Sequence, residues 1–148
     1  MFNTGYELIF AGIIAAMSAQ LIKFLGYSIR YRKINFSVLF TTGGMPSSHS
    51  AGVCSMATSA GLIRGFDSVE FAIAVGLALV VMYDAAGIRR AAGKMAVTLN
   101  KMMEDVYSHN SQEVGEKLKE LLGHTPFEVF VGSLWGIFAA WAIHLYIV

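Results

Sequence analysis

The sequence predicts an all-α integral membrane protein, a small bundle of about four transmembrane helices with amphipathic helices at the membrane surface. Of the 148 residues, 55% are hydrophobic and only 14% are charged, and the mean hydropathy is +0.57. These values are too apolar for an ordinary soluble domain of this length. The apolar residues fall in four runs separated by polar segments, so we expect one membrane domain covering residues 1–148.

The predicted spans are residues 8–27, 47–63, 71–87 and 127–147. The first is apolar from residue 8 to residue 22 apart from Ser18 and Gln20, and it reaches spanning length if Lys23 extends its charge toward the interface. The second is rich in Gly, Ala and Ser, which let helices approach closely, so we expect it inside the bundle. The third is apolar until Asp84, and the fourth opens on Thr125, Pro126 and Glu128 with capping-box spacing.

Residues 23–44 and 88–123 are the two long polar connections. The first is basic and rich in aromatic residues, as expected for an anchor at acidic headgroups. In the second, the spacing of Met95, Leu99, Met102 and Val106 predicts an amphipathic helix that lies at the interface or covers the mouth of the bundle. A further short helix is expected between Asn110 and Gly123.

The distribution of Lys and Arg predicts the topology. Ten of the eleven lie in the segments 23–33 and 89–119, which follow the first and third spans and therefore share one side of the membrane. The positive-inside rule assigns that side to the cytoplasm of a cell membrane. The single cysteine, Cys54, excludes a disulfide framework and a cysteine-based metal site.

A polar turn, residues 43–50, holds the first group of candidate site residues. Gly43 and Gly44 free the backbone, Pro46 suits the first turn of a helix, and Ser47 and Ser48 can cap its amide groups, so an anion would fit there. The plainer interpretation is a capped helix start that happens to carry a histidine.

Two histidines, His49 and His124, enter the same membrane face from the starts of two helices. With cations and helix-start amides around them, they suit phosphoryl transfer: one imidazole attacks phosphorus while the other protonates the leaving oxygen. No metal or other cofactor is needed for this scheme, and zinc ligation by the same histidines lacks the close spacing of a typical site. Glu128 is, in the plainer interpretation, only a helix cap.

Asp84 is the one acid inside the third span. An acid there is expensive unless it is paired. We expect either a structural pair with Arg89 or Lys23, or a place in the site.

At these residues the sequence resembles the type 2 phosphatidic acid phosphatase superfamily, and most closely its small divergent membrane branch. Lys23 and Arg30 have the spacing of the first superfamily motif, with Tyr31 in place of proline. Pro46-Ser47-Ser48-His49 is similar to the second motif, with serine replacing glycine, and His124 and Glu128 match the end of the third, with Glu for Asp. Leu118 stands where the third motif has arginine, and Arg89, in YDAAGIRRAAG, is the candidate replacement.

The resemblance implies roles for these residues. His124 would be the nucleophile that forms a phosphohistidine, His49 the general acid, and Glu128 the carboxylate that orients His124. Phosphate would be bound by Lys23, Arg30, Ser47 and Ser48, with Arg89 added by inference.

The predicted function is that of a metal-independent phosphatase of membrane lipid phosphates, of the phosphatidate, phosphatidylglycerophosphate or polyprenyl phosphate class. The expected partners are such a lipid and the bilayer, with no nucleic acid. Familiar members of the superfamily have about six spans, so a homodimer would be one way to complete the enclosure. The alternatives are a noncatalytic phospholipid-binding or lipid-transport protein that retains the phosphate pocket, and a structural subunit of a larger membrane complex.

Overall fold

A computed structural model describes residues 5–40, 43–107 and 123–147, and this part of the chain contains helices and no strands. In order along the chain, the elements are α1 (Gly5–Tyr31), a short 3₁₀ helix η1 (Phe36–Phe40), α2 (Ser48–Arg64), α3 (Val69–Tyr83), a π-helical turn η2 (Asp84–Ile88), α4 (Arg89–Tyr107) and α5 (Pro126–Ile147). The predicted all-α fold is therefore confirmed.

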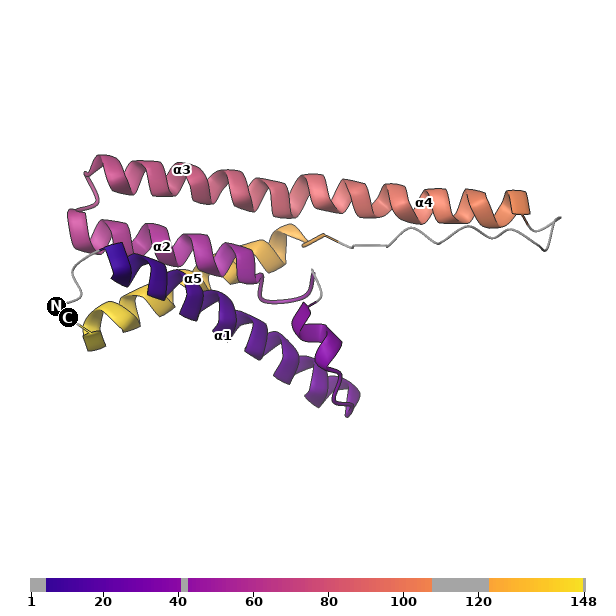
Figure 1. Ribbon diagram of the computed structural model, residues 1–148, viewed down its shortest axis with the longest axis horizontal. Helices are drawn as coiled ribbons and strands as arrows, with labels where there is room; N and C mark the ends of the chain where they lie inside the picture. The colour runs from indigo at the N-terminus through magenta and orange to yellow at the C-terminus, as the bar shows by residue number, and fades with distance from the viewer. Residues whose placement is uncertain (1–4, 41–42, 108–122, 148) are drawn as a thin grey trace.

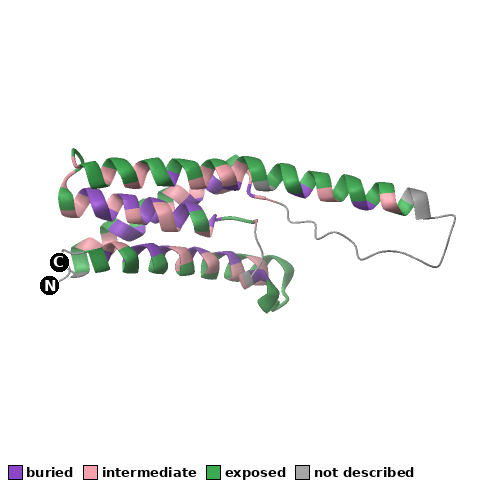
Figure 2. Ribbon diagram, turned by 45° about the horizontal axis from the view of Figure 1, so that its top comes forward, coloured by how far each residue is buried: buried purple, intermediate pink, exposed green. Residues whose placement is uncertain are grey.

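Helices α1, α2 and α5 pack against one another, and α3 lies along α2 (Figure 1). Helix α4 continues the line of α3 and extends well beyond the other helices, while the start of α1 and the end of α5 lie together at the opposite end. Burial follows this arrangement: α2 carries more buried residues than any other helix, whereas α3 and α4 are largely exposed (Figure 2). Helix α2 is thus the centre of the bundle.

Three described helical segments are long and apolar enough to cross a membrane: Gly5–Tyr31, Val69–Glu104 and Pro126–Tyr146. Helix α2 has 17 residues, or about 26 Å, slightly less than the roughly 30 Å of a hydrocarbon core. Its predicted place inside the bundle fits the structure, because its small residues face α1 and α5. A side chain added at Gly12, Gly132 or Gly136 would collide with α2, at Met56, Ser47 and Ala51 respectively. Such close approach of helices is typical of small-residue packing in membranes.

Two predicted boundaries differ from the structure. Helix α1 continues to Tyr31, beyond the predicted end of the first span at residue 27 and into the predicted connector, because nothing interrupts the helix before Arg32, which takes a positive φ of 50°. The third span does not stop at residue 87, since η2 joins α3 directly to α4. The amphipathic helix predicted around Met95 is α4, and the short helix predicted after Asn110 lies outside the described residues.

Candidate functional site

The polar turn forms the start of α2. Gly43 and Gly44 have φ values of 100° and 84°, in the left-handed region that favours glycine. Ser47 is the N-cap: its hydroxyl accepts a hydrogen bond from the Ser50 backbone N–H at 3.3 Å and another from the Ser50 hydroxyl at 3.0 Å. The predicted cap is confirmed for Ser47, whereas Ser48 is the first residue of the helix, and Pro46 precedes the helix and does not lie in its first turn.

Helix α5 begins with a second capped turn, which holds His124. The His124 backbone N–H donates to the carbonyl of Ala85 in η2 at 3.1 Å. Glu128 Oε2 accepts the Thr125 backbone N–H at 3.2 Å and lies 3.2 Å from His124 Nδ1, while Thr125 Oγ1 accepts the Glu128 backbone N–H at 3.3 Å. One carboxylate therefore caps the helix, as the plainer interpretation expects, and also contacts the imidazole, while its catalytic role stays a prediction.

The two turns are tied to each other. The Ser47 backbone N–H donates to the Glu128 backbone carbonyl at 3.2 Å. The His49 and His124 rings lie with their centroids 6.3 Å apart and their planes 67° apart. His49 is exposed, whereas His124 is only 2% exposed. Residues 75 positions apart in the sequence thus form one histidine pair.

His124 Nε2 is buried, and no described residue forms a well-aligned hydrogen bond with it, although the Gly44 backbone lies close enough to favour the protonated ring. If the Nδ1 proton points to Glu128, Nε2 carries the free lone pair. Burial lowers the pKa of His124 below its ordinary value of 6.5, and the Glu128 carboxylate only partly opposes this shift. The imidazole is therefore neutral at physiological pH.

Lys23 brings a positive charge to this pair. It is 7% exposed, and Gly44 packs on its side chain, so that a Cβ added at Gly44 would lie 3.2 Å from Lys23 Cδ. Its ammonium interacts electrostatically with Glu128 and His124. The positive φ favours glycine at position 44, and a side chain there would also press on Lys23.

Arg30 does not join Lys23. It lies seven residues later on α1, about 10 Å further along the helix axis. Its side chain is exposed and its guanidinium carbon lies 5.9 Å from the centre of the Tyr31 ring. Its predicted phosphate contact stays a prediction.

The remaining predicted site residues lie around the pair. Ser48 is the first residue of α2 and is half-buried, whereas the Ser47 hydroxyl is used by the cap, so a direct phosphate contact of Ser47 stays a prediction. Asp84 opens η2, and Arg89 follows it at the start of α4. The Arg89 side chain lies outside the described residues, so its pairing with Asp84 and its role as replacement cation also stay predictions. The backbone bond from His124 to Ala85 nevertheless places η2 beside the site.

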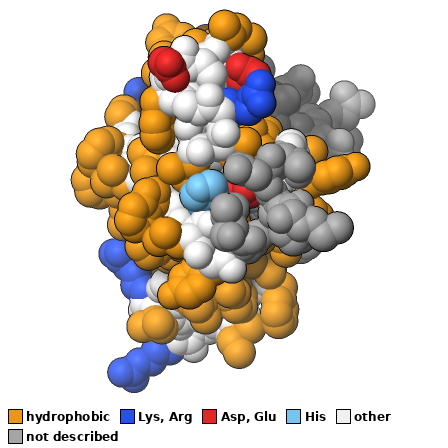
Figure 3. All heavy atoms as spheres, turned by 90° about the vertical axis from the view of Figure 1, so that its left-hand side faces the viewer, with side chains coloured by type: hydrophobic (Ala, Val, Ile, Leu, Met, Phe, Trp, Pro, Cys, Tyr) orange, Lys and Arg blue, Asp and Glu red, His pale blue; other side chains and the backbone are white. Residues whose placement is uncertain are grey.

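The structure contains a second histidine–glutamate pair, which the sequence does not predict. His144 Nδ1 lies 2.7 Å from Glu7 Oε1, which joins the end of α5 to the start of α1, and the Glu7 side chain is fully buried. The pair lies at the end of the bundle where α1 begins and α5 ends; Figure 3 views that end, where a histidine and a few charged groups lie among mostly hydrophobic side chains. An acid near the start of one apolar run and a histidine near the end of another were the available signals.

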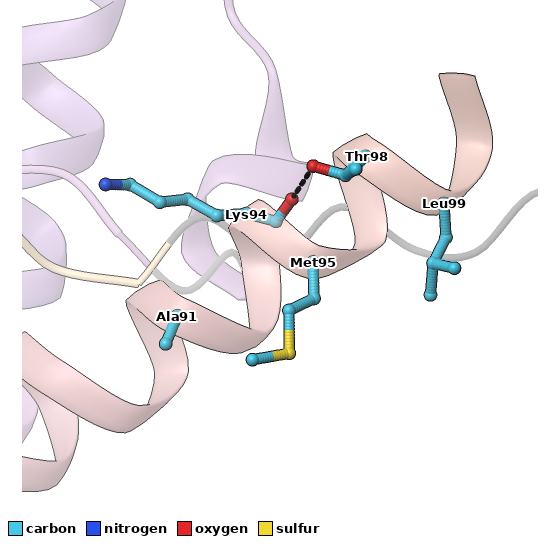
Figure 4. Close-up of a pocket in the computed structure, with 5 residues that line it drawn as sticks. All are labelled: Ala91, Lys94, Met95, Thr98 and Leu99. Carbon is cyan, nitrogen blue, oxygen red and sulfur yellow. Dashed lines mark hydrogen bonds between the residues drawn. The ribbon is translucent and has the colours of Figure 1, made fainter. Parts of the chain in front are cut away.

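No other described feature gathers comparable chemistry. A shallow groove of about 560 Å³ on α4 is lined by Ala91, Lys94, Met95, Thr98 and Leu99 (Figure 4). Its only titratable group is Lys94, and the Thr98 hydroxyl donates to the Lys94 carbonyl of the same helix. Among the described residues, no three His, Cys, Asp or Glu side chains gather closely enough to hold a metal ion.

Comparison with known proteins places this geometry in context. The model of a family described as the "Divergent PAP2 family" matches residues 5–139. The chain is also 41% identical, over 144 residues and 90% of each chain, to "Uncharacterized membrane protein YuiD" of Bacillus subtilis (strain 168). No solved structure matches. The matched range contains both capped turns and all the residues from Lys23 to Glu128, and the relative supports a multi-pass membrane protein.

Proposed function

The chain belongs to the divergent PAP2 family, and from this premise we propose that it hydrolyses membrane lipid phosphates, without a metal ion, through a phosphohistidine on His124. The observation that carries the proposal is the histidine pair: two imidazoles 6.3 Å apart, at the starts of two helices whose first turns are bonded to each other. At this distance the two rings are in edge contact, so both are close enough to act on one phosphoryl group that enters beside them.

The first chemical step follows from the protonation of the two rings. The lone pair on His124 Nε2 attacks phosphorus, the bond from phosphorus to the ester oxygen breaks, and His49, as imidazolium, gives its proton to the leaving alkoxide. The Nδ1 proton of His124 stays directed at Glu128, whose negative charge stabilises the positive charge that develops on the ring.

The second step restores the enzyme. Neutral His49 takes a proton from a water molecule, the resulting hydroxide attacks phosphorus, and the bond from phosphorus to His124 Nε2 breaks. Inorganic phosphate leaves, His124 is again neutral and His49 again carries a proton.

Positive charge for the nonbridging oxygens comes from Lys23 and from the N-terminal amides of α2 and α5. These groups are fixed before substrate arrives, because Gly44 holds Lys23 in place and the caps hold the helix starts. The arrangement supports a phosphate monoester or diphosphate at the membrane surface, of the phosphatidate, phosphatidylglycerophosphate or polyprenyl phosphate class.

A noncatalytic phospholipid-binding or lipid-transport protein is the second candidate. It is favoured by Leu118 at the position of the motif arginine and by Arg30, whose guanidinium lies over Tyr31. Loss of one preorganised donor costs about a hundredfold to a thousandfold in rate, so a pocket lacking both arginines would bind phosphate and turn it over slowly.

A phosphate-release screen separates the two. The purified full-length protein, in detergent and with a chelator present, is given phosphatidate, phosphatidylglycerophosphate and polyprenyl diphosphate. We expect release from at least one lipid, a loss of about a thousandfold or more in His124→Ala, and a phosphoenzyme that this variant cannot form. Unchanged release in both His49→Ala and His124→Ala would refute the catalytic assignment. Saturable lipid binding that Lys23→Met weakens, without any phosphate release, would support the second candidate.

We also propose that the site faces the cytoplasm, since it shares its side of the membrane with nearly all the Lys and Arg residues. A cysteine introduced by S108C in the Cys54→Ser protein tests this, because a membrane-impermeant maleimide should label it only after the cells are opened. Labelling of intact cells would place the site on the outer face.

A further inference from the structure

An apolar groove of about 700 Å³ runs between α1 and α5 and ends at the polar turn. Ile22 and Gly26 line it from α1, Leu134 and Trp135 from α5, and Met45 and Pro46 from the turn itself. Its volume lies in the range of pockets that hold small ligands. Since α1 and α5 are both membrane-spanning helices, the groove lies beside the bilayer.

The groove is continuous with the histidine site. Pro46 immediately precedes the N-cap Ser47, and Ile22 immediately precedes Lys23. On the α5 side, Gly132 packs directly against Ser47, one turn before the groove residue Trp135. A molecule in the groove would therefore contact the residues adjoining the phosphate-binding groups.

Trp135 lies at the floor of this groove, between α5 and α1. Its indole N–H donates to the Ser18 hydroxyl on α1 at 2.9 Å, and its ring lies against Phe138 with centroids 5.7 Å apart. Ser18 is one turn below Ile22, so the hydrogen bond crosses from α5 to α1 at that depth. The indole is held in one orientation and keeps a chain from passing between the helices at that level, while the groove continues along α5 to Phe138.

We propose that this groove holds the hydrocarbon chain of the lipid phosphate while its phosphate lies at His49 and His124, and that Trp135 forms the floor of the groove between α1 and α5. The proposal rests on the proposed function for the phosphate position. A substrate chain that enters the groove comes from the bilayer, which is already apolar, so the transfer adds little hydrophobic binding energy. The groove instead orients the headgroup toward the histidines. Bulk lipid alone would not explain why the groove ends at the polar turn.

A matched pair of glycine variants tests the groove in turnover. A Cβ at Gly26 or at Gly76 meets nothing within 4 Å, and leucine is a better helix former than glycine, so Gly26→Leu and Gly76→Leu should both fold. Gly26 lies in the groove, whereas Gly76 lies on α3. For Gly26→Leu we expect the ratio of kcat/KM for a long-chain lipid phosphate to that for a water-soluble phosphate ester to fall about tenfold. Gly76→Leu should keep the wild-type ratio. An unchanged ratio in Gly26→Leu, or an equal change in both variants, would overturn the proposal.

A fluorescence measurement tests the groove without turnover. The chain has two tryptophans, so in the Trp141→Phe protein the emission reports Trp135 alone. Phosphatidate with brominated chains, added to micelles of the full-length protein, should quench this emission saturably, and Gly26→Leu should abolish the saturable part.

Brominated phosphatidylcholine is the comparison in this measurement. Equal quenching by the two lipids would show that the groove takes any bilayer lipid and would overturn the proposal. Saturable quenching by phosphatidate without phosphate release would refute hydrolysis while keeping the groove as a chain site, so failure of either proposal is recognised separately.

Discussion

The two ends of α5 carry the same chemical pair in different settings. His124 and Glu128 belong to one helix turn, four residues apart, with a second histidine and Lys23 beside them. His144 and Glu7 are 137 residues apart in sequence and join α5 to α1 through a 2.7 Å contact. Each pair places a carboxylate against an imidazole at a helix start, yet among the described residues only the first pair has a second histidine and Lys23 beside it. The comparison teaches that a histidine–carboxylate pair becomes a candidate catalytic group through its neighbours and otherwise ties helices together.

The largest expected difference between the two ends is in turnover. His49→Ala removes the acid for the leaving oxygen and should lower the rate of phosphate release by about 10²- to 10⁴-fold. His144→Ala, at the other end of α5, should stay within about twofold of wild type per folded molecule. Phosphate release normalised to folded protein, assessed by size-exclusion chromatography, measures both. Equal losses in the two variants would remove the distinction between the ends.

Stability should show the reverse order. His144→Ala leaves the fully buried Glu7 carboxylate without its partner, and loss of one member of a buried pair lowers the free energy of unfolding by about 3 kcal/mol or more. His124→Ala should cost about 1 kcal/mol, because Glu128 keeps the Thr125 backbone N–H. Equilibrium unfolding of the detergent-solubilised protein in SDS gives both values.

The double variant Glu7→Ala/His144→Ala is the control for this effect. If the cost of His144→Ala arises from the stranded carboxylate, the double variant should lose less stability than the sum of the two single variants. Additive losses would instead assign the cost to packing at each position.

The smallest effect, and the one most specific to His124, is in pH dependence. Burial lowers its folded-state pKa below the ordinary 6.5, so the imidazole stays unprotonated, and able to attack, somewhat below that pH. As the pH is lowered, kcat/KM for a soluble phosphate ester should therefore begin to decrease with a midpoint below pH 6.5. The contribution of His124 to the free energy of unfolding is complete above pH 6.5. It is lost as the pH falls through the lowered pKa, because the unfolded chain binds the proton at a higher pH than the folded chain does. An acid limb above 6.5 would contradict the assignment, and His124→Gln should remove this part of the pH dependence of stability.

The fold was largely predictable because its signals are local. Apolar runs, the Thr125 and Glu128 spacing, and the small residues of α2 each fix their own element. The end of α1 was harder to predict, since the basic residues from Lys23 onward favour an interface but do not interrupt a helix before Arg32. The sequence also did not predict that α3 and α4 are continuous. The residues change from apolar to polar at Asp84, but the helical backbone is not interrupted there.

The candidate site was predictable where motif and local geometry coincide. The two capped turns are bonded to each other and Gly44 packs on Lys23, which brings four predicted residues close together: His49, His124, Glu128 and Lys23. Arg30 shares the motif spacing but lies beyond the turn, so spacing alone did not decide its place. The Glu7–His144 pair could not be derived, since it depends on which helices pack together and at what level.

The tight packing of α5 on α2 restricts how the protein can move. A Cβ at Gly132 would lie 2.5 Å from the Ser47 carbonyl oxygen, and one at Gly136 would overlap the Ala51 carbonyl. Rotating α5 by one residue would bring Ser133 or Ile137 into these positions, so the two helices cannot turn or slide past each other without separating. Any opening that admits a lipid or releases phosphate must therefore leave this unit rigid and displace α1 or α3 around it.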